Sequence, residues 1–152
     1  MLQTMLRERF GLRYRMEERG HLAYALVKAN RDFPLRGVDP NKAKERVIET
    51  PAGINRGGTA EWAGGFSAVA ISLHDFCSNF LSKRMDAPVL DMTGIAGDYE
   101  IDLRWDAPEG YVPNDPEMIR AIEQKLGLKL EKRKLSLDAL MIEHLDKMPT
   151  EN

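Results

Sequence analysis

The chain has 152 residues, 43% of them hydrophobic and 30% charged, which is typical of one soluble globular domain. Its formal net charge of −2 argues against general attraction to nucleic acid, and no apolar run is long enough to span a membrane. The single cysteine, Cys77, excludes an intrachain disulfide and is expected to pack in the core. Charged residues interrupt the first ten positions, where a signal peptide needs an apolar core, so the chain as written is expected in the cytoplasm.

The first part of the chain predicts one helix and two strands. Apolar residues at positions 2, 5, 6 and 10 share one helical face, and Gly11 stands where a glycine cap would end that helix. Apolar and charged residues alternate in 12–17, while 22–28 is more continuously apolar. Because Arg19 and Gly20 separate these two runs, we predict a β-hairpin with its turn at this pair.

Regular patterns stop between Asn30 and Gly65, where prolines and glycines recur. We therefore predict a single domain over residues 1–152 with a long irregular loop at about 30–65, in which only 41–48 could form a short helix. Trp62 is a large aromatic residue inside this loop. It either fixes the loop to the core or lines a ligand site, and both interpretations stay open.

The central segment predicts a strand followed by a helix. Residues 66–71 form the apolar run of a strand, and Ser72 is typical of a helix N-cap. Asp75, three residues later, fits the partner position of a capping box. Apolar residues then recur at helical spacing, and the helix is expected to end near Met85.

The second half predicts a strand pair, a helix and a second strand pair. Residues 89–105 indicate a short strand, a tight glycine turn and a longer strand whose apolar and charged residues alternate. The last helix is predicted to begin at Asp115 and to end at Gly127. Two strands, 128–132 and 137–144, are expected to close the chain around a basic turn.

The predicted order is therefore α-β-β-(long loop)-β-α-β-β-α-β-β. Strands cluster in pairs and helices stand between the pairs, which favours an α+β fold with helices packed on a mostly antiparallel sheet. A doubly wound nucleotide-binding sheet is disfavoured, because its strands and helices would alternate.

The stretch VLDMTGIAGDYEIDLRW, residues 89–105, resembles a family signature, V-x-D-x-T-G-L-x-G-x-Y-D-F-x-L-x-W. The family is common in soil bacteria and is known only as a domain of unknown function. The stretches LQTMLRERFGLRYRMEER, YALVKA and the C-terminal residues that end in Pro149–Asn152 fit it as well. Its layout is similar to the short N-terminal α+β domains of secretins and TonB-type outer-membrane transporters, which implies a binding or assembly role by analogy.

This chain departs from the family pattern in two ways. Family members usually carry a signal sequence and a further N-terminal segment, so full-length members are expected in the cell envelope and this chain is expected to lack that part. Its absence would uncover apolar surface, and we therefore expect a homo-oligomer. His21 and His74 occupy positions where family members more usually carry other residues.

A metal site is the sharpest enzymatic hypothesis. The three histidines, His21, His74 and His144, all fall at the ends of predicted elements, where side chains can converge. The carboxylates near them in sequence are Asp75, Asp91 and Asp146. Imidazoles with a carboxylate or water could hold a divalent metal such as zinc or manganese in an open hydrolytic site. The spacings match no metal signature such as H-E-x-x-H, so three ordinary surface histidines are the competing interpretation.

Two functions follow from the sequence. The first is a small binding or assembly module without a recognisable reaction, self-associating and with an unknown small-molecule ligand. The alternative is a metal-dependent hydrolase that acts on phosphoesters or similar substrates. No G-x-S-x-G nucleophile motif occurs, and the glycine turn at 93–97 lacks the lysine and the following helix that a phosphate loop needs.

Overall fold

A computed structural model describes residues 2–29, 34–43, 45–51 and 53–146; the family-like tail Pro149–Asn152 lies outside this range. The chain divides into two compact units. We call residues 1–21 and 134–152 the ribbon unit and residues 22–133 the core unit. Two long strands, β1 (Arg13–Lys28) and β9 (Leu128–His144), contribute one end to each unit.

Each unit has its own set of further elements. The ribbon unit adds the helix α1 (Leu2–Phe10). The core unit adds, in chain order, β2 (Arg36–Val38), α2 (Pro40–Ala43), β3 (Val47–Thr50), β4 (Gly53–Arg56), β5 (Thr59–Trp62), β6 (Gly65–Ser72), α3 (Leu73–Asp75), the π-helical segment η1 (Phe76–Leu81), α4 (Ser82–Arg84), β7 (Val89–Asp91), β8 (Asp98–Arg104) and α5 (Pro116–Leu126).

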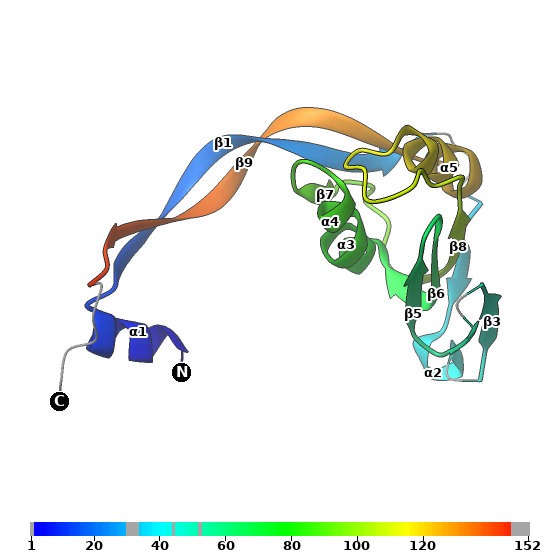
Figure 1. Cartoon of the computed structure of the whole chain (residues 1–152), viewed down its shortest axis with the longest axis horizontal. Helices are drawn as coiled ribbons and strands as arrows, with labels where there is room; N and C mark the ends of the chain where they lie inside the picture. Colours follow the sequence, from blue (N-terminus) through cyan, green and yellow to red (C-terminus); the bar gives the residue numbers. More distant parts are fainter. Residues whose placement is uncertain (1, 30–33, 44, 52, 147–152) are drawn as a thin grey trace. The chain divides into compact units, whose positions relative to one another are not determined.

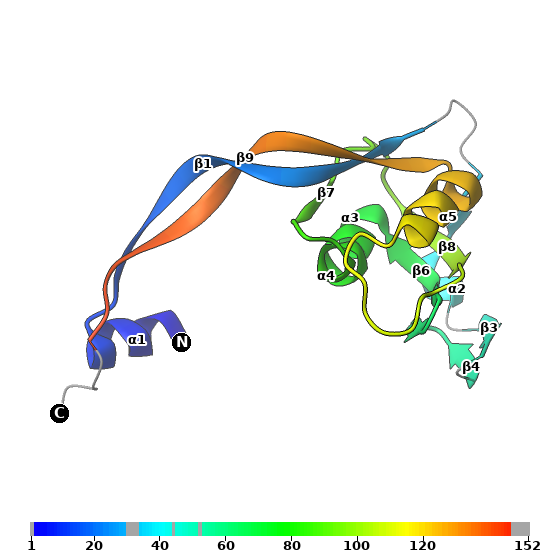
Figure 2. The same cartoon turned by 45° about the horizontal axis from the view of Figure 1, so that its top comes forward.

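Strand pairing in the core unit is mostly antiparallel. The strands β2, β8, β6 and β5 form one sheet in that order, and β3 pairs with β4. The exception is β7, which runs parallel to β1 and places Val89 opposite Tyr24. Helices pack among these strands (Figures 1 and 2). The predicted α+β class with a mostly antiparallel sheet is therefore confirmed.

The helix predicted after the central strand is confirmed together with its cap. At the end of β6, Ser72 Oγ accepts a hydrogen bond from the backbone N–H of Asp75 at 3.0 Å. This bond satisfies one of the donors that a helix N-terminus leaves open. Helical turns then continue through α3, η1 and α4 as far as Arg84, just before the predicted end at Met85.

The second predicted helix also has the expected ends. Asp115 Oδ1 accepts a hydrogen bond from the backbone N–H of Glu117 at 2.9 Å, and Pro116 takes the first helical position. Gly127 ends α5 with a φ of +64°, in the left-handed region where a side chain would be strained. Short-range sequence signals therefore define this helix at both ends.

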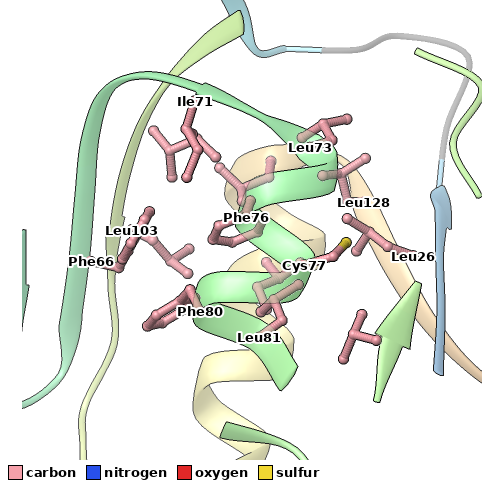
Figure 3. Close-up of a cluster of buried hydrophobic side chains, with 14 of the residues drawn as sticks. Leu26, Phe66, Ile71, Leu73, Phe76, Cys77, Phe80, Leu81, Leu103 and Leu128 are labelled. Atoms are coloured by element: carbon pink, nitrogen blue, oxygen red, sulfur yellow. The ribbon is translucent and has the colours of Figure 1, made fainter. Parts of the chain in front are cut away.

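Aromatic side chains fill the centre of the core unit. The ring of Phe66, on β6, lies 4.3 Å from Phe80 and 5.3 Å from Phe76, centroid to centroid, and both of these residues stand on η1 (Figure 3). Leu26 and Leu128, from β1 and β9, are fully buried in the same cluster. The two long strands thus supply part of the core as well as the ribbon unit.

Cys77 lies in this cluster, as the sequence indicates. Its side chain is buried between the aromatic rings and the neighbouring strands (Figure 3). Burial raises the pKa of the Cys77 thiol to about 12, with a smaller contribution from the Asp91 carboxylate. A thiol in this environment stays neutral and unreactive near neutral pH.

The stretch 89–105 divides between two sheets. The short strand β7 joins β1, whereas the longer strand β8 lies between β2 and β6. The alternation predicted for β8 is confirmed, since Ile101 and Leu103 are fully buried while Asp102 and Arg104 are exposed. The family-like signature therefore connects the sheet β7-β1-β9 to the sheet β2-β8-β6-β5.

Both predicted terminal hairpins are wrong. Residues 13–17 and 22–28 belong to one continuous strand, β1, and the two final strands merge into β9. Gly20 has no positive φ, unlike the turn glycines of this chain, so the pair Arg19–Gly20 continues the strand. Its missing side chain leaves room for Lys134, whose Cε lies 2.7 Å from the point where a Cβ on Gly20 would stand.

The segment expected to be an irregular loop carries short regular elements. Within its described part, β2 pairs with β8, β3 pairs with β4, and β5 pairs with β6. The only helix among the described residues of this segment is α2, which begins one residue before the predicted stretch 41–48 but ends at Ala43, and Val47 and Ile48 belong to β3 instead. These strands have three or four residues each, so turns occupy much of the segment between them.

Candidate interaction surface

The ribbon unit contains two strand segments, Arg13–His21 of β1 and Lys134–His144 of β9, which run side by side (Figures 1 and 2). Two contacts show which residues share a face. Lys134 lies over Gly20, and Arg15 Nε forms an ion pair with Glu143 Oε1 at 3.6 Å. Because side chains alternate along a strand, even-numbered residues of both segments lie on one face and odd-numbered residues on the other.

The even-numbered face exposes large apolar side chains. Met16 is 56% exposed, Leu140 is 49% exposed and Ile142 is 58% exposed. We call these three residues the apolar ribbon face. A two-stranded ribbon buries little apolar surface by itself, and the described part of the ribbon unit adds to it the helix α1. Exposed apolar groups that lie together on a surface are typical of an interaction site.

The odd-numbered face has a different character. Its apolar residues, Leu135, Leu137 and Met141 of β9, are half-buried. Arg13, Arg15, Glu17 and Arg19 of β1 lie on the same face, where Arg15 pairs with Glu143 and Arg19 Nε donates to Glu17 Oε2 at 2.8 Å. The aliphatic stems of such side chains can cover apolar neighbours while their charged ends remain in water.

The helix α1 is attached where the two strands end. Gly11 ends the helix with a φ of +57°, so the predicted glycine cap is confirmed. The backbone N–H of Leu12 donates to Leu6 O at 3.2 Å, and that of Asp146 donates to Phe10 O at 2.8 Å. These bonds join the first helix of the chain to the end of β9 within the ribbon unit.

The ribbon unit also has open backbone edges and segments of opposite charge. Among the described residues, no further strand pairs with Arg13–His21 or with Lys134–His144. Residues 1–21 carry five arginines and three glutamates, a net charge of +2. Residues 134–152 carry two lysines and four carboxylates, a net charge of −2.

The predicted metal ligands occupy separate positions. His144 Nε2 lies 2.9 Å from Asp146 Oδ1, and both side chains are about half exposed. His21 stands exposed on β1, and His74 stands exposed in the first turn of α3. Across the part of the chain that the structure describes, no three His, Cys, Asp or Glu residues are grouped so that they could hold a metal ion.

The predicted carboxylate ligands have local structural partners. Asp75 Oδ2 accepts a hydrogen bond from Ser72 Oγ at 2.9 Å. Asp91 Oδ1 accepts bonds from the backbone N–H of Thr93 at 3.0 Å and from Thr93 Oγ1 at 2.7 Å. These contacts stabilise the start of a helix and the turn after β7. Of the six predicted ligands, His144 and Asp146 lie within hydrogen-bond distance of each other.

Trp62 lies at the end of β5, beside the turn into β6. Its indole occupies the space above Gly65, where an added Cβ would meet the ring at 2.0 Å. The Arg104 guanidinium stands 5.9 Å from the ring centroid, a cation–π contact. These contacts favour the interpretation of Trp62 as an anchor, while its role in a ligand site stays a prediction.

Sequence reasoning missed the apolar ribbon face, because it divided each long strand into a hairpin. A usable signal was present in 135–142, where apolar residues occupy both even and odd positions. A strand with one solvated face normally keeps apolar residues to a single parity. Apolar residues on both faces are typical of a strand that is covered on both sides.

No helix in the described residues is both long enough and apolar enough to cross a membrane.

The comparisons with known proteins place the chain in one family. No curated protein and no solved structure matches the chain. The model of one family, described as "Protein of unknown function (DUF3738)", matches residues 1–145. Because this match covers nearly the whole chain, the protein belongs to the DUF3738 family.

Proposed function

We propose that this protein is a non-catalytic assembly module that associates with a second copy of itself through the apolar ribbon face. The observation that carries this proposal is the exposure of Met16, Leu140 and Ile142, each about half exposed, on one face of a two-stranded ribbon. Covering such side chains contributes roughly 25 cal/mol for each Å² of apolar surface removed from water. A second copy supplies an apolar surface of matching size.

Charge supports a second copy as the partner. When two ribbons stack face to face about a two-fold axis that runs along the strands, Arg13–His21 of each copy lies over Lys134–His144 of the other. Residues 1–21 carry a net charge of +2 and residues 134–152 a net charge of −2. Contacts of this kind are related by a two-fold axis and close into a dimer. The pairing of opposite charges adds specificity to the apolar contact.

The proposal predicts a concentration-dependent mass. In sedimentation velocity experiments, the weight-average sedimentation coefficient is expected to rise with protein concentration from that of a 17.2 kDa monomer to that of a dimer. Moderate salt is expected to leave the dimer largely intact, because the apolar contact is not screened. A 17.2 kDa species at every concentration would contradict the proposal.

A further inference from the structure

The core unit contains a cavity whose lining residues all belong to that unit. It has a volume of about 250 Å³ and is lined by the loop that follows β8, by the turn between β5 and β6, by the end of α4 and by the start of α5. Its lining includes Gly64, Arg84, Trp105, Pro108, Tyr111 and Met118. At ~30 Å³ for each water of the liquid, the space equals about eight waters, so it suits a ligand of roughly ten non-hydrogen atoms.

The loop of residues 106–114, which lines the cavity, is hydrogen-bonded to the C-terminal end of α4. Tyr111 OH donates to Lys83 O at 2.8 Å, and the backbone N–H of Asn114 donates to Arg84 O at 3.0 Å. In return, Asn114 Oδ1 accepts a bond from the backbone N–H of Asp86 at 2.9 Å. These bonds use carbonyls that the end of a helix leaves open, and they hold the loop in place as a wall.

Two charged side chains, Arg84 and Asp115, line the cavity. Both carboxylate oxygens of Asp115 accept hydrogen bonds from neighbouring residues. Asp115 Oδ2 accepts a hydrogen bond from Trp105 Nε1 at 2.9 Å, and Asp115 Oδ1 accepts the capping bond from Glu117. Asp115 is also almost fully buried. Its carboxylate therefore orients the indole of Trp105 and begins α5, so it is occupied by structural contacts.

The guanidinium of Arg84 has N–H donors that no contact with the described residues uses. Among those residues, its hydrogen bond from Nη2 to Glu61 Oε2 is long at 3.4 Å, and its guanidinium stands 5.7 Å from the centroid of the Phe80 ring. A guanidinium has five N–H donors in a planar fork that matches a carboxylate. The polar group that the cavity offers to a ligand is thus a cation.

We propose that this cavity binds a small aromatic carboxylate. The carboxylate pairs with Arg84, and the aromatic ring lies against Trp105, Pro108 and Met118. A mostly apolar site with one well-placed polar group is the usual form of a small-molecule site. This inference is independent of self-association, because every lining residue belongs to the core unit.

The first test uses Trp105 as the reporter. The chain has two tryptophans, so Trp62→Phe leaves Trp105 as the single source of indole emission. Titration with phenylacetate is expected to change that emission saturably. Phenylacetamide, of the same shape but without charge, is expected to bind about tenfold more weakly. No saturable change with phenylacetate, or equal or tighter binding of phenethylamine, would overturn the proposal.

A second test separates Arg84 from general effects on the fold. Arg84→Gln is expected to weaken phenylacetate binding about tenfold, and Glu61→Gln is expected to strengthen it because the guanidinium loses its competing carboxylate. Arg120→Gln is the matched control, since this exposed arginine pairs with Glu117 on the surface of α5. Circular dichroism checks that each variant is folded. Unchanged affinity in both Arg84→Gln and Glu61→Gln would overturn the assignment.

Discussion

Phe80→Ala is expected to lower the free energy of unfolding of the core unit by about 3–5 kcal/mol. The Phe80 side chain is 1% exposed and its ring contacts Phe66 at 4.3 Å and Phe76 at 5.5 Å, centroid to centroid. It also faces Trp105 at 6.4 Å. Truncation removes the burial of one ring and leaves a cavity that three other rings line, and these rings belong to different elements that cannot all move inward.

Urea denaturation followed by far-UV circular dichroism measures this loss. Val47→Ala is the control, because Val47 is 48% exposed on β3 and its truncation opens no cavity. The control is expected to change the unfolding free energy by less than about 1 kcal/mol. If Phe80→Ala lost no more stability than Val47→Ala, the aromatic cluster would not be the centre of this fold.

Leu140→Lys is expected to raise the dimer dissociation constant by roughly a hundredfold. The substitution removes an apolar side chain from the middle of the apolar ribbon face and puts a charge where the proposed partner copy would cover it. In a two-fold dimer the change occurs twice. Sedimentation velocity at a concentration where the wild-type protein is dimeric is expected to show a monomer for this variant.

Ser136→Lys is the matched control for this variant. Ser136 is exposed on the same strand and on the same even-numbered face as Leu140. It is not one of the three residues that make up the apolar ribbon face. The added charge is therefore the same, but no apolar contact is lost. Equal dissociation constants for Leu140→Lys and Ser136→Lys would show that the apolar contact does not hold the dimer.

Features set by neighbouring residues could be predicted from the sequence. Ser72 and Asp115 begin their helices as expected, because a cap is a bond between residues two or three positions apart. The alternation of β8 was readable for a similar reason: Ile101 and Leu103 face one buried layer. Gly11 and Gly127 likewise end their helices with positive φ.

Features set by distant residues could not be predicted. Gly20 looked like a turn, but Lys134 from the other end of the chain lies over it and the strand continues. The parallel pairing of β7 with β1 places Val89 opposite Tyr24, and no pattern in either stretch of sequence predicts this contact. The strands of three or four residues between 36 and 62 are too short to show a period.

The two candidate sites could not be predicted either, because each is formed by residues that are far apart in the sequence. The apolar ribbon face joins Met16 to Leu140 and Ile142, which stand at opposite ends of the chain. The cavity gathers Arg84, Trp105 and Met118 from three elements. Sequence reasoning instead looked for histidines, because they are rare and chemically distinctive, and the described residues do not bring the three histidines together as ligands.

The most direct test of the proposed assembly is cross-linking at the face itself. Ile142→Cys places a thiol on the apolar ribbon face, whereas Cys77 is buried with its pKa raised to about 12 and does not compete. Glu123→Cys, on the exposed side of α5, is the control. With a short bis-maleimide, Ile142→Cys is predicted to form a covalent dimer much faster than Glu123→Cys. Equal rates for the two proteins would contradict the account.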